Sequence, residues 1–208
     1  MNERLTSTWA VLDEAHLALR AVVEGVRPGD WTRPTPCARW SVAQVLQHAA
    51  GDQLGYAASI TGSGGPAFDP FSPAGHLGPV DRPGAGLVDL ADEAMRASAA
   101  AWATVAQDAT AVPTPLPQGK LPGRLAAGAC ALDAAVHAWD IALATDRPSP
   151  LGNALSGELL EVARELVEPL RAWGAYAAIL PADPSDDDTA ILLRYLGRDP
   201  HWTAAPAV

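Results

Sequence analysis

Four polar side chains recur at spacings of three and four residues along one apolar stretch of the chain. They are Cys130, Asp133, His137 and Asp140, in the segment LAAGACALDAAVHAWDIALAT. If this stretch is helical, Asp133 and His137 project side by side, with Cβ atoms about 5–6 Å apart. A carboxylate and an imidazole at that separation can share one metal ion. The surrounding residues are almost all alanine, so little except an ion or another of these groups can solvate them.

A third ligand is available from an earlier apolar segment, VAQVLQHAAGDQLGY, which contains His48. We expect its helix to face the helix of Asp133 and His137 across the interior of a bundle. Two imidazoles and one carboxylate leave at least one coordination position open, as in catalytic metal sites. Zn²⁺ is the expected cation, and Fe²⁺, Ni²⁺ or Mn²⁺ suit the same ligands. The pattern alone also allows a hydrogen-bonded or salt-bridged Asp–His pair without metal.

Asp52 and Asp140 each lie about one helical turn beyond a proposed histidine ligand. A carboxylate in such a place can accept the second imidazole N–H, which fixes the tautomer and basicity of the ligand. We therefore expect both carboxylates to support catalysis. The alternative is that they cap helices or bind a neighbouring segment.

Three further groups have both a structural and a chemical interpretation. His16 interrupts an apolar stripe, either as a hydrogen-bonded core histidine or as a contact of the metal-bound water or substrate. Cys130 is either a small buried side chain or a metal or thiol-exchange partner. Cys37 precedes a helix, whose N-terminus could lower the pKa of its thiol, or it packs beneath the connector.

Two turn-rich segments carry charged residues. His76 and Arg82 lie in a Gly/Pro-rich loop over 61–86, which we expect to gate access to the site. There they either hold an anionic group of a substrate or are simply solvated. The acidic run 186–188 looks like a metal cluster, but capping of a helix N-terminus explains it better.

Apolar residues at helical spacing predict long helices over about 5–25, 42–60, 87–109, 122–145 and 151–170. A short helix follows the acidic run, and Arg194 and Arg198 near its C-terminus suit the helix dipole. Ser41 and Gln44 form an S-x-x-Q capping box, and a short extended pair is expected around Gln118. Four long helices with two long connections indicate an all-α four-helix bundle over 1–147, with a C-terminal helical extension over 148–208 packed on it.

The composition supports this fold class and excludes several functions. Of 208 residues, 49% are hydrophobic and 18% are charged, and the net charge at pH 7 is −10. Lys120 is the only lysine and the arginines are scattered, so no basic face for nucleic acid is expected. We predict no membrane span, no signal peptide and no disulfide framework. These features favour a cytoplasmic protein without nucleic-acid or membrane partners, and an Ala-rich bundle is compatible with a homodimer.

Three separated segments resemble the signatures of one family. The segment WTRPTPCARWSVAQVLQHAAGD is similar to the N-terminal signature of actinobacterial proteins related to mycothiol-dependent maleylpyruvate isomerase. VHAWDIALAT resembles their second signature, and LGRDPHW resembles the C-terminal ending of one of their subfamilies. The wider relatives are DinB-like four-helix metalloproteins. The resemblance implies a metal triad inside the bundle, with His48 as the helix-two ligand and Asp133 and His137 as the carboxylate–x₃–His pair.

The chain departs from the isomerase in two respects. The resemblance implies a Glu in the isomerase at the position of Asp133. The shorter Asp133 side chain should draw the metal toward the fourth helix or weaken its binding. Only residues 148–208 follow that helix, whereas the isomerase carries a larger C-terminal domain that contributes to its substrate site. The first departure bears on the metal and the second on the substrate.

The resemblance implies a metal-dependent enzyme that uses a low-molecular-weight thiol, with mycothiol as the expected co-substrate. Its reaction would be S-transfer or isomerisation on a small electrophilic substrate, and hydrolysis by metal-bound hydroxide is a related option. Two alternatives remain open because a fold does not determine a function. One is a non-catalytic bundle that binds a metal, a small ligand or a protein. The other is a scaffold recruited to a biosynthetic step without metal.

Overall fold

The computed structural model describes residues 9–75 and 84–204. Within these ranges the fold is all-α, as predicted, with one short hairpin. The helices are α1 (Ala10–Val23), α2 (Val42–Thr61), α3 (Leu87–Trp102), α4 (Gly123–Ala144), α5 (Asn153–Ala172) and α6 (Asp188–Tyr195). The hairpin strands are β1 (Val112–Pro113) and β2 (Lys120–Leu121), which confirm the predicted extended pair.

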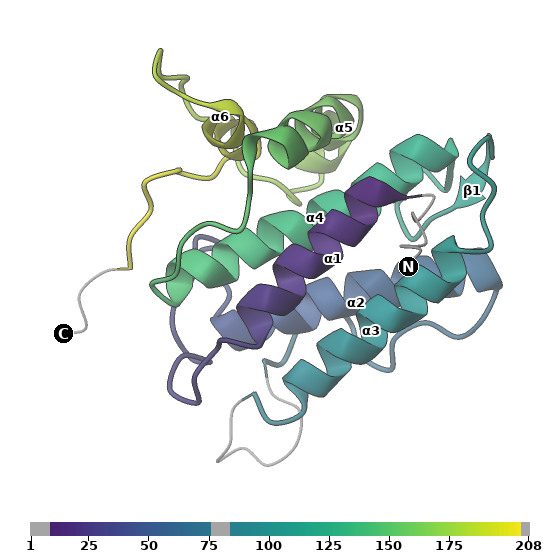
Figure 1. Cartoon of the computed structure of the whole chain (residues 1–208), viewed down its shortest axis with the longest axis horizontal. Coiled ribbons are helices and arrows are strands. Elements are labelled where there is room, and N and C mark those ends of the chain that lie inside the picture. Colours follow the sequence, from purple (N-terminus) through teal and green to yellow (C-terminus); the bar gives the residue numbers. More distant parts are fainter. Residues whose placement is uncertain (1–8, 76–83, 205–208) are drawn as a thin grey trace, which may run out of the picture.

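Helices α1 to α4 form a four-helix bundle in which α4 packs between α1 and α2. Helix α3 completes the ring beside α2 and α1 (Figure 1). Helices α1 and α4 run in one direction and α2 and α3 in the other, because the connection after α2 returns along the bundle before α3 begins. Helices α2 and α4 are therefore neighbours, and not partners across the interior as the sequence analysis expected.

The second helix begins as its sequence predicts. The Ser41 side chain accepts a hydrogen bond from the Gln44 backbone N–H, and the Gln44 side chain accepts one from the Ser41 N–H. This reciprocal capping satisfies two backbone donors that no helical carbonyl can reach. Gly62 ends the helix in the left-handed region, with φ of 73°.

The third helix ends at Trp102, and not at residue 109 as predicted. The carbonyl of Trp102 accepts a hydrogen bond from the indole Nε1 of Trp9 at 3.0 Å, and that of Ala101 accepts one from the Thr104 hydroxyl at 2.7 Å. These side chains satisfy carbonyls that a longer helix would have paired with its own N–H groups. The predicted start of the first helix, at residue 5, lies outside the described residues.

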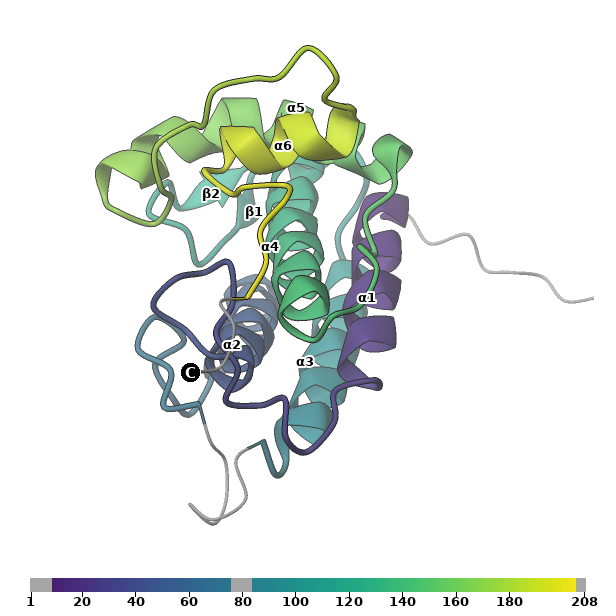
Figure 2. The same ribbon diagram turned by 90° about the vertical axis from the view of Figure 1, so that its left-hand side faces the viewer.

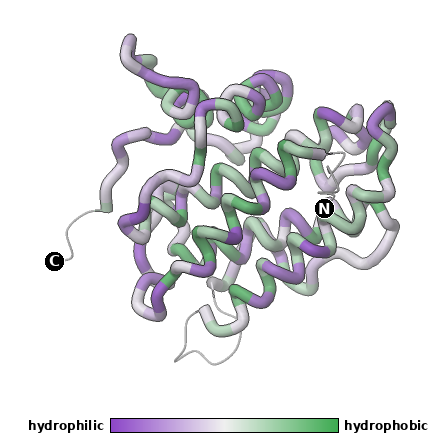
Figure 3. The backbone as a smooth tube through the Cα atoms, viewed as in Figure 1, coloured by the Kyte–Doolittle hydropathy of each residue, from purple (hydrophilic) through white to green (hydrophobic). Residues whose placement is uncertain are grey.

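Helix α4 is the central helix of the fold, and most of its residues are buried on every side. By length and composition alone it could cross a membrane, but 83% of its apolar window is buried inside the protein. Figure 3 shows hydrophobic residues along the helices interrupted by hydrophilic ones, with hydrophilic residues frequent in the connections. The apolar character of α4 is therefore explained by its place in the core.

The C-terminal extension lies across the bundle. Helices α5 and α6 pack side by side and cross α4 steeply (Figure 2). The crossing is close because Gly128 of α4 leaves room for α5, since a Cβ at Gly128 would lie 2.5 Å from Val162 Cγ2. Asp187 caps α6 by accepting a hydrogen bond from the Ala190 N–H at 2.9 Å, in agreement with the capping interpretation of the acidic run.

A buried polar cluster joins the four bundle helices through one amide. Gln53 Oε1 of α2 accepts hydrogen bonds from His16 Nε2 at 2.8 Å, Ser98 Oγ at 2.9 Å and Cys130 Sγ at 3.1 Å. The Gln53 amide Nε2 donates to the Cys130 carbonyl at 3.1 Å. Burial lowers the pKa of His16, which keeps its ring neutral. These contacts favour the structural interpretation of both His16 and Cys130.

Replacement of Gln53 by leucine is expected to destabilise the fold by about 2–4 kcal/mol, because three buried donors would lose their shared acceptor. Ser98→Ala removes one donor only and should cost about 1 kcal/mol. Urea unfolding of the two variants measures both free energies. Equal losses in the two variants would show that Gln53 is not the centre of the cluster.

Candidate metal centre

Three metal-ligating side chains converge between α2 and α4. His48 Nε2 lies 3.3 Å from Asp133 Oδ1, and His137 Nε2 lies 3.4 Å from the same oxygen. One ligand atom from each residue lies within 4.8 Å of the other two. The four-residue spacing places Asp133 and His137 on one face of α4, and His48 reaches them because α2 packs directly against α4. The shorter Asp133 side chain still lies almost equally far from both imidazoles.

Both imidazoles are oriented through their Nδ1 atoms. His137 Nδ1 lies 2.9 Å from Asp140 Oδ2, and His48 Nδ1 lies 2.9 Å from the Pro70 carbonyl oxygen. Because each acceptor takes an N–H, the proton of a neutral ring resides on Nδ1 and the Nε2 lone pair faces Asp133. The Trp40 ring packs against His48, with 4.7 Å between ring centroids. Neither the spacing nor the type of Trp40 indicated this contact.

The donor set fits a divalent cation. In a tetrahedral zinc site, ligand atoms about 2.0–2.1 Å from the metal lie about 3.4 Å from one another. The two Nε2–Oδ1 distances, 3.3 and 3.4 Å, match that separation and are long for hydrogen bonds. The second carboxylate oxygen of Asp133 is buried and has no hydrogen-bond partner in the described part of the chain. Such an atom is costly unless a cation compensates it.

The two supporting carboxylates differ in their positions. Asp140 contacts His137, as its spacing predicted. Asp52 has no hydrogen bond to His48 among the described contacts, and the Pro70 carbonyl occupies the place expected for it. The loop approaches α2 at Gly51, where a Cβ would lie only 2.6 Å from the Pro70 side chain. Asp52 instead lines a cavity beside the three ligands.

Arg198 extends this arrangement from the end of the chain. Its Nε donates to Asp140 Oδ1 at 2.9 Å and its Nη2 donates to Asp140 Oδ2 at 2.8 Å. The expectation that Arg198 serves the helix dipole was wrong, because its side chain is engaged by Asp140. Only its place in the LGRDPHW segment signalled a role. Arg194, in contrast, pairs with Asp186 at 2.8 Å, away from the triad.

The charges of the centre support one another. Burial opposes ionisation of Asp133, but the imidazoles of His137 and His48 outweigh it and hold its pKa well below the usual range. Burial disfavours a charged His137, yet Asp133 and Asp140 raise its pKa to about 10. Burial likewise opposes ionisation of Asp140, but Arg198 and His137 lower its pKa to about 2. Both carboxylates are therefore ionised at neutral pH.

The metal-free protein is expected to lose stability as the pH rises from about 6.5 to 10. The pKa of His137 is about 10 in the folded protein and about 6.5 in an unfolded chain. A raised pKa stabilises the fold fully below the unfolded value, and the contribution disappears as pH passes the folded value. Unfolding in urea with a chelator should reveal a loss on the order of 5 kcal/mol.

The matched variant for this alkaline loss is His137→Gln, which has no titrating ring and should show a flatter profile. Identical slopes in the two proteins would contradict the assignment. The lowered pKa of Asp140 acts in the opposite sense, because its stabilising contribution is lost as pH falls from about 3.8 toward 2.

The triad opens on a cavity of about 670 Å³. Its lining combines bundle residues around the ligands with Leu166, Val167 and Leu170 of α5. Cys37 also lines the cavity, and burial raises the pKa of its thiol. A helix N-terminus could have lowered that pKa, but desolvation of the thiol reverses the expected direction.

The described part of the 61–86 loop contributes Phe71 to the cavity. The Phe71 ring packs edge-on against His48, with 5.8 Å between ring centroids. His76 and Arg82, the charged residues expected to contact a substrate, lie outside the described residues.

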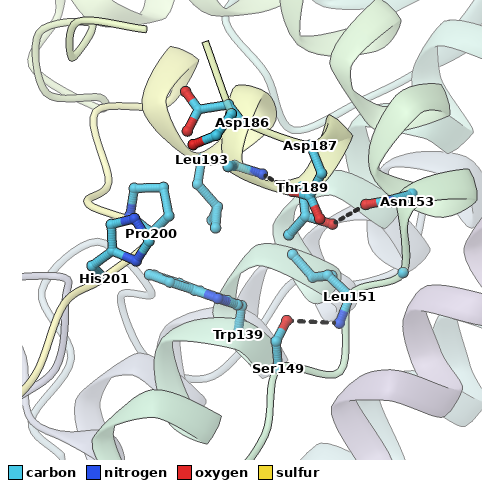
Figure 4. Close-up of a pocket in the computed structure, with 13 residues that line it drawn as sticks. Trp139, Ser149, Leu151, Asn153, Asp186, Asp187, Thr189, Leu193, Pro200 and His201 are labelled. Atoms are coloured by element: carbon cyan, nitrogen blue, oxygen red, sulfur yellow. Dashed lines mark hydrogen bonds between the residues drawn. The ribbon is translucent and has the colours of Figure 1, made fainter. Parts of the chain in front are cut away.

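A second cavity, of about 560 Å³, lies between Trp139 of α4 and the start of α6 (Figure 4). Its polar groups bond one another. Thr189 donates to the Asn153 side chain at 3.2 Å, and the Leu151 N–H donates to the Ser149 hydroxyl at 3.1 Å. Of its acids, Asp187 caps α6. The polar groups named here hold the extension together, whereas the metal-ligating side chains that converge in the described part of the chain are those of the triad.

Comparison with known proteins gives one family and two relatives. Residues 12–142 match the family described as mycothiol maleylpyruvate isomerase N-terminal domain. Uncharacterised proteins from Mycobacterium tuberculosis strains CDC 1551 / Oshkosh and H37Rv are each 32% identical over 155 residues, which cover 73% of this chain and 75% of the relative. No solved structure matches the chain significantly. The matched segment contains the triad and Asp140, whereas α5 and Arg198 lie beyond it.

Proposed function

The chain belongs to the mycothiol maleylpyruvate isomerase N-terminal domain family, and from this premise we propose that it is a metal-dependent enzyme using a low-molecular-weight thiol. Mycothiol is the proposed thiol and Zn²⁺ the proposed cation. The reaction is S-transfer or isomerisation on a small electrophilic substrate. The observation that carries this proposal is the convergence of His48, Asp133 and His137 at the wall of a cavity large enough for a small molecule.

The role of the three ligands follows from their chemistry. A divalent cation held by them supplies Lewis acidity, which lowers the pKa of a bound thiol and makes it a nucleophile near neutral pH. Asp140 and the Pro70 carbonyl hold the two Nδ1–H groups, so both Nε2 atoms stay directed toward Asp133. Arg198 in turn fixes both oxygens of Asp140. The ligands are thus oriented before any substrate arrives.

Asp52 is the group that we assign to proton transfer. It lines the same cavity as the triad, without holding either imidazole. Burial and the nearby charge of Asp133 raise the pKa of Asp52 well above its usual value, which favours the protonated carboxyl. When a thiolate adds to an electrophilic double bond, a C–S bond forms and the adjacent carbon becomes carbanionic. Asp52 can supply the proton to that carbon and recover it when the C–S bond breaks in isomerisation.

The surrounding residues support a cytoplasmic enzyme. Cys37 and Cys130 are free thiols, which accords with the reducing compartment that the proposal requires. The apolar side chains of α5 keep water from the wall facing the triad, which strengthens the electrostatic interactions inside the cavity.

The test is thiol turnover by the full chain loaded with Zn²⁺. Mycothiol and 1-chloro-2,4-dinitrobenzene, a general aryl electrophile, should form the S-aryl adduct and release chloride faster than in buffer. The acceleration should disappear with a chelator and in the His48→Ala variant. Stoichiometric zinc binding with a rate equal to that in buffer for this and other electrophiles would overturn the proposal and leave a metal-binding bundle.

A further inference from the structure

Part of the cavity lining is apolar and comes from the C-terminal extension. Leu166, Val167 and Leu170 of α5 contribute this apolar wall, and the Pro115–Pro117 turn between β1 and β2 lines the same cavity. This wall is positioned by tight packing, because Gly128 lets α5 approach α4 closely. The family match ends at residue 142. The residues that select a substrate on this side therefore lie outside the segment that defines the family.

Two large aromatic side chains stand exposed around the same cavity. Phe71 is 70% exposed and Trp173 is 71% exposed, and both line the cavity. They come from opposite parts of the fold, Phe71 from the loop after α2 and Trp173 from the end of α5. Exposed aromatic groups gathered at a concave site are typical of places where a ligand covers them.

The charges around the cavity restrict which ligand can enter. Arg198 lines the cavity, but its Nε and Nη2 atoms donate hydrogen bonds to Asp140, so its charge is already paired. Arg39 is exposed at the cavity, and no ion pair of Arg39 is found in the described parts of the chain. Outside the triad and Asp52, this arrangement offers one cation without an ion pair in the described residues, Arg39, beside the apolar side chains of α5. A small dianion would have to bury a carboxylate against leucine and proline side chains, which is strongly unfavourable.

We propose that the electrophilic substrate is a hydrophobic molecule with an aromatic or similarly flat apolar body, seated between α5 and the Pro115–Pro117 turn. Phe71 and Trp173 cover this body at the mouth, and any single anionic group lies at Arg39. The cavity volume, about 670 Å³, lies within the range of about 300–1,000 Å³ that small-molecule sites occupy. The reaction of such a substrate rests on the proposed function, whereas its binding to the apolar wall does not require a metal.

The experiment measures binding of 2-naphthol, a neutral two-ring aromatic, to the full chain by isothermal titration calorimetry. We expect one site, and we expect maleate, a small dianion, to bind at least tenfold more weakly. The Phe71→Ala, Trp173→Ala double variant should bind 2-naphthol at least tenfold more weakly than wild type. Because both side chains are largely exposed, this variant is expected to fold, which circular dichroism checks.

The matched control is Leu17→Ala, since Leu17 is 66% exposed but does not line the cavity. Its affinity for 2-naphthol should equal that of wild type within twofold. If 2-naphthol fails to bind, if the double variant binds like wild type, or if maleate binds more tightly, the proposal is overturned.

The same titration on chelator-treated protein separates this proposal from the proposed function. Binding of 2-naphthol to metal-free protein, together with an absence of thiol turnover, would refute the enzymatic proposal and support the hydrophobic site. Turnover of thiol with dianionic electrophiles in preference to aromatic ones would support the enzymatic proposal and refute the hydrophobic site.

Discussion

Replacement of His137 by alanine is expected to weaken zinc binding by about 10²- to 10³-fold, since four-ligand zinc sites gain about 10–16 kcal/mol shared among their ligands. His137 supplies one of the three ligand atoms and lies 3.4 Å from Asp133 Oδ1. Its loss leaves His48 and Asp133 as the two remaining ligands, which hold a cation more weakly than three. Competition with a chromophoric chelator at fixed pH measures the change in affinity.

The control for this prediction is His201→Ala. His201 is an exposed histidine in the C-terminal segment and does not line the triad cavity. Its replacement should leave zinc affinity unchanged. Equal affinities in the His137→Ala protein and in wild type would show that the metal, if bound, is held elsewhere.

Replacement of Arg198 by methionine is expected to weaken zinc binding by about 10- to 100-fold, the usual effect of removing a group that orients a metal ligand. Methionine keeps an unbranched apolar stem but removes both hydrogen bonds to Asp140, at 2.9 and 2.8 Å. Asp140 would then be buried with His137 as its remaining charged partner. Its pKa should rise, and its hold on the Nδ1–H of His137 should weaken.

Arg194→Met provides a matched control on the same part of the chain. Arg194 forms a comparable ion pair with Asp186, so its loss should affect stability without affecting zinc affinity. The effects of Arg198→Met and Asp140→Asn should be less than additive in the double variant, because both act through His137. Equal zinc affinity in the Arg198 and Arg194 variants would contradict a link between the extension and the metal centre.

Much of the centre could be predicted because its information is local. The i,i+4 spacing of Asp133 and His137 and the i,i+3 spacing of His137 and Asp140 fix which side chains share a face of α4 once a helix forms. Ser41 and Gln44 similarly fix the start of α2. Nearest-neighbour helical geometry needs no knowledge of the rest of the fold, so these expectations agree with the structure.

The contacts that were missed are made over long sequence separations. Pro70 reaches His48 because the loop folds back along α2 at Gly51. Arg198 reaches Asp140 across 58 positions. Neither residue shows a periodic pattern of its own, and such pairings depend on packing of the extension and the loop. The end of α3 was also missed, because the indole of Trp9, 93 positions away, takes the carbonyl of Trp102.

Asp133 is shorter than the Glu implied for the isomerase, yet it still reaches both imidazoles. Asp133 Oδ1 lies 3.3 Å from one imidazole and 3.4 Å from the other, so close packing of α2 on α4 compensates for the shorter side chain. Alanine is frequent among the buried residues of both helices, and the distance between packed helices depends on the side chains at their contact.

Cobalt substitution tests the central claim most directly. Co²⁺ added to the metal-free full chain should bind with one equivalent and give the visible absorption of a four- or five-coordinate site. Mycothiol should then add a sulfur-to-cobalt charge-transfer band, because a thiol occupies the open position. Both signals should be absent in the His48→Ala and His137→Ala proteins. Cobalt spectra that are the same in wild type and in these variants, or that do not respond to the thiol, would contradict a cation site open to the cavity.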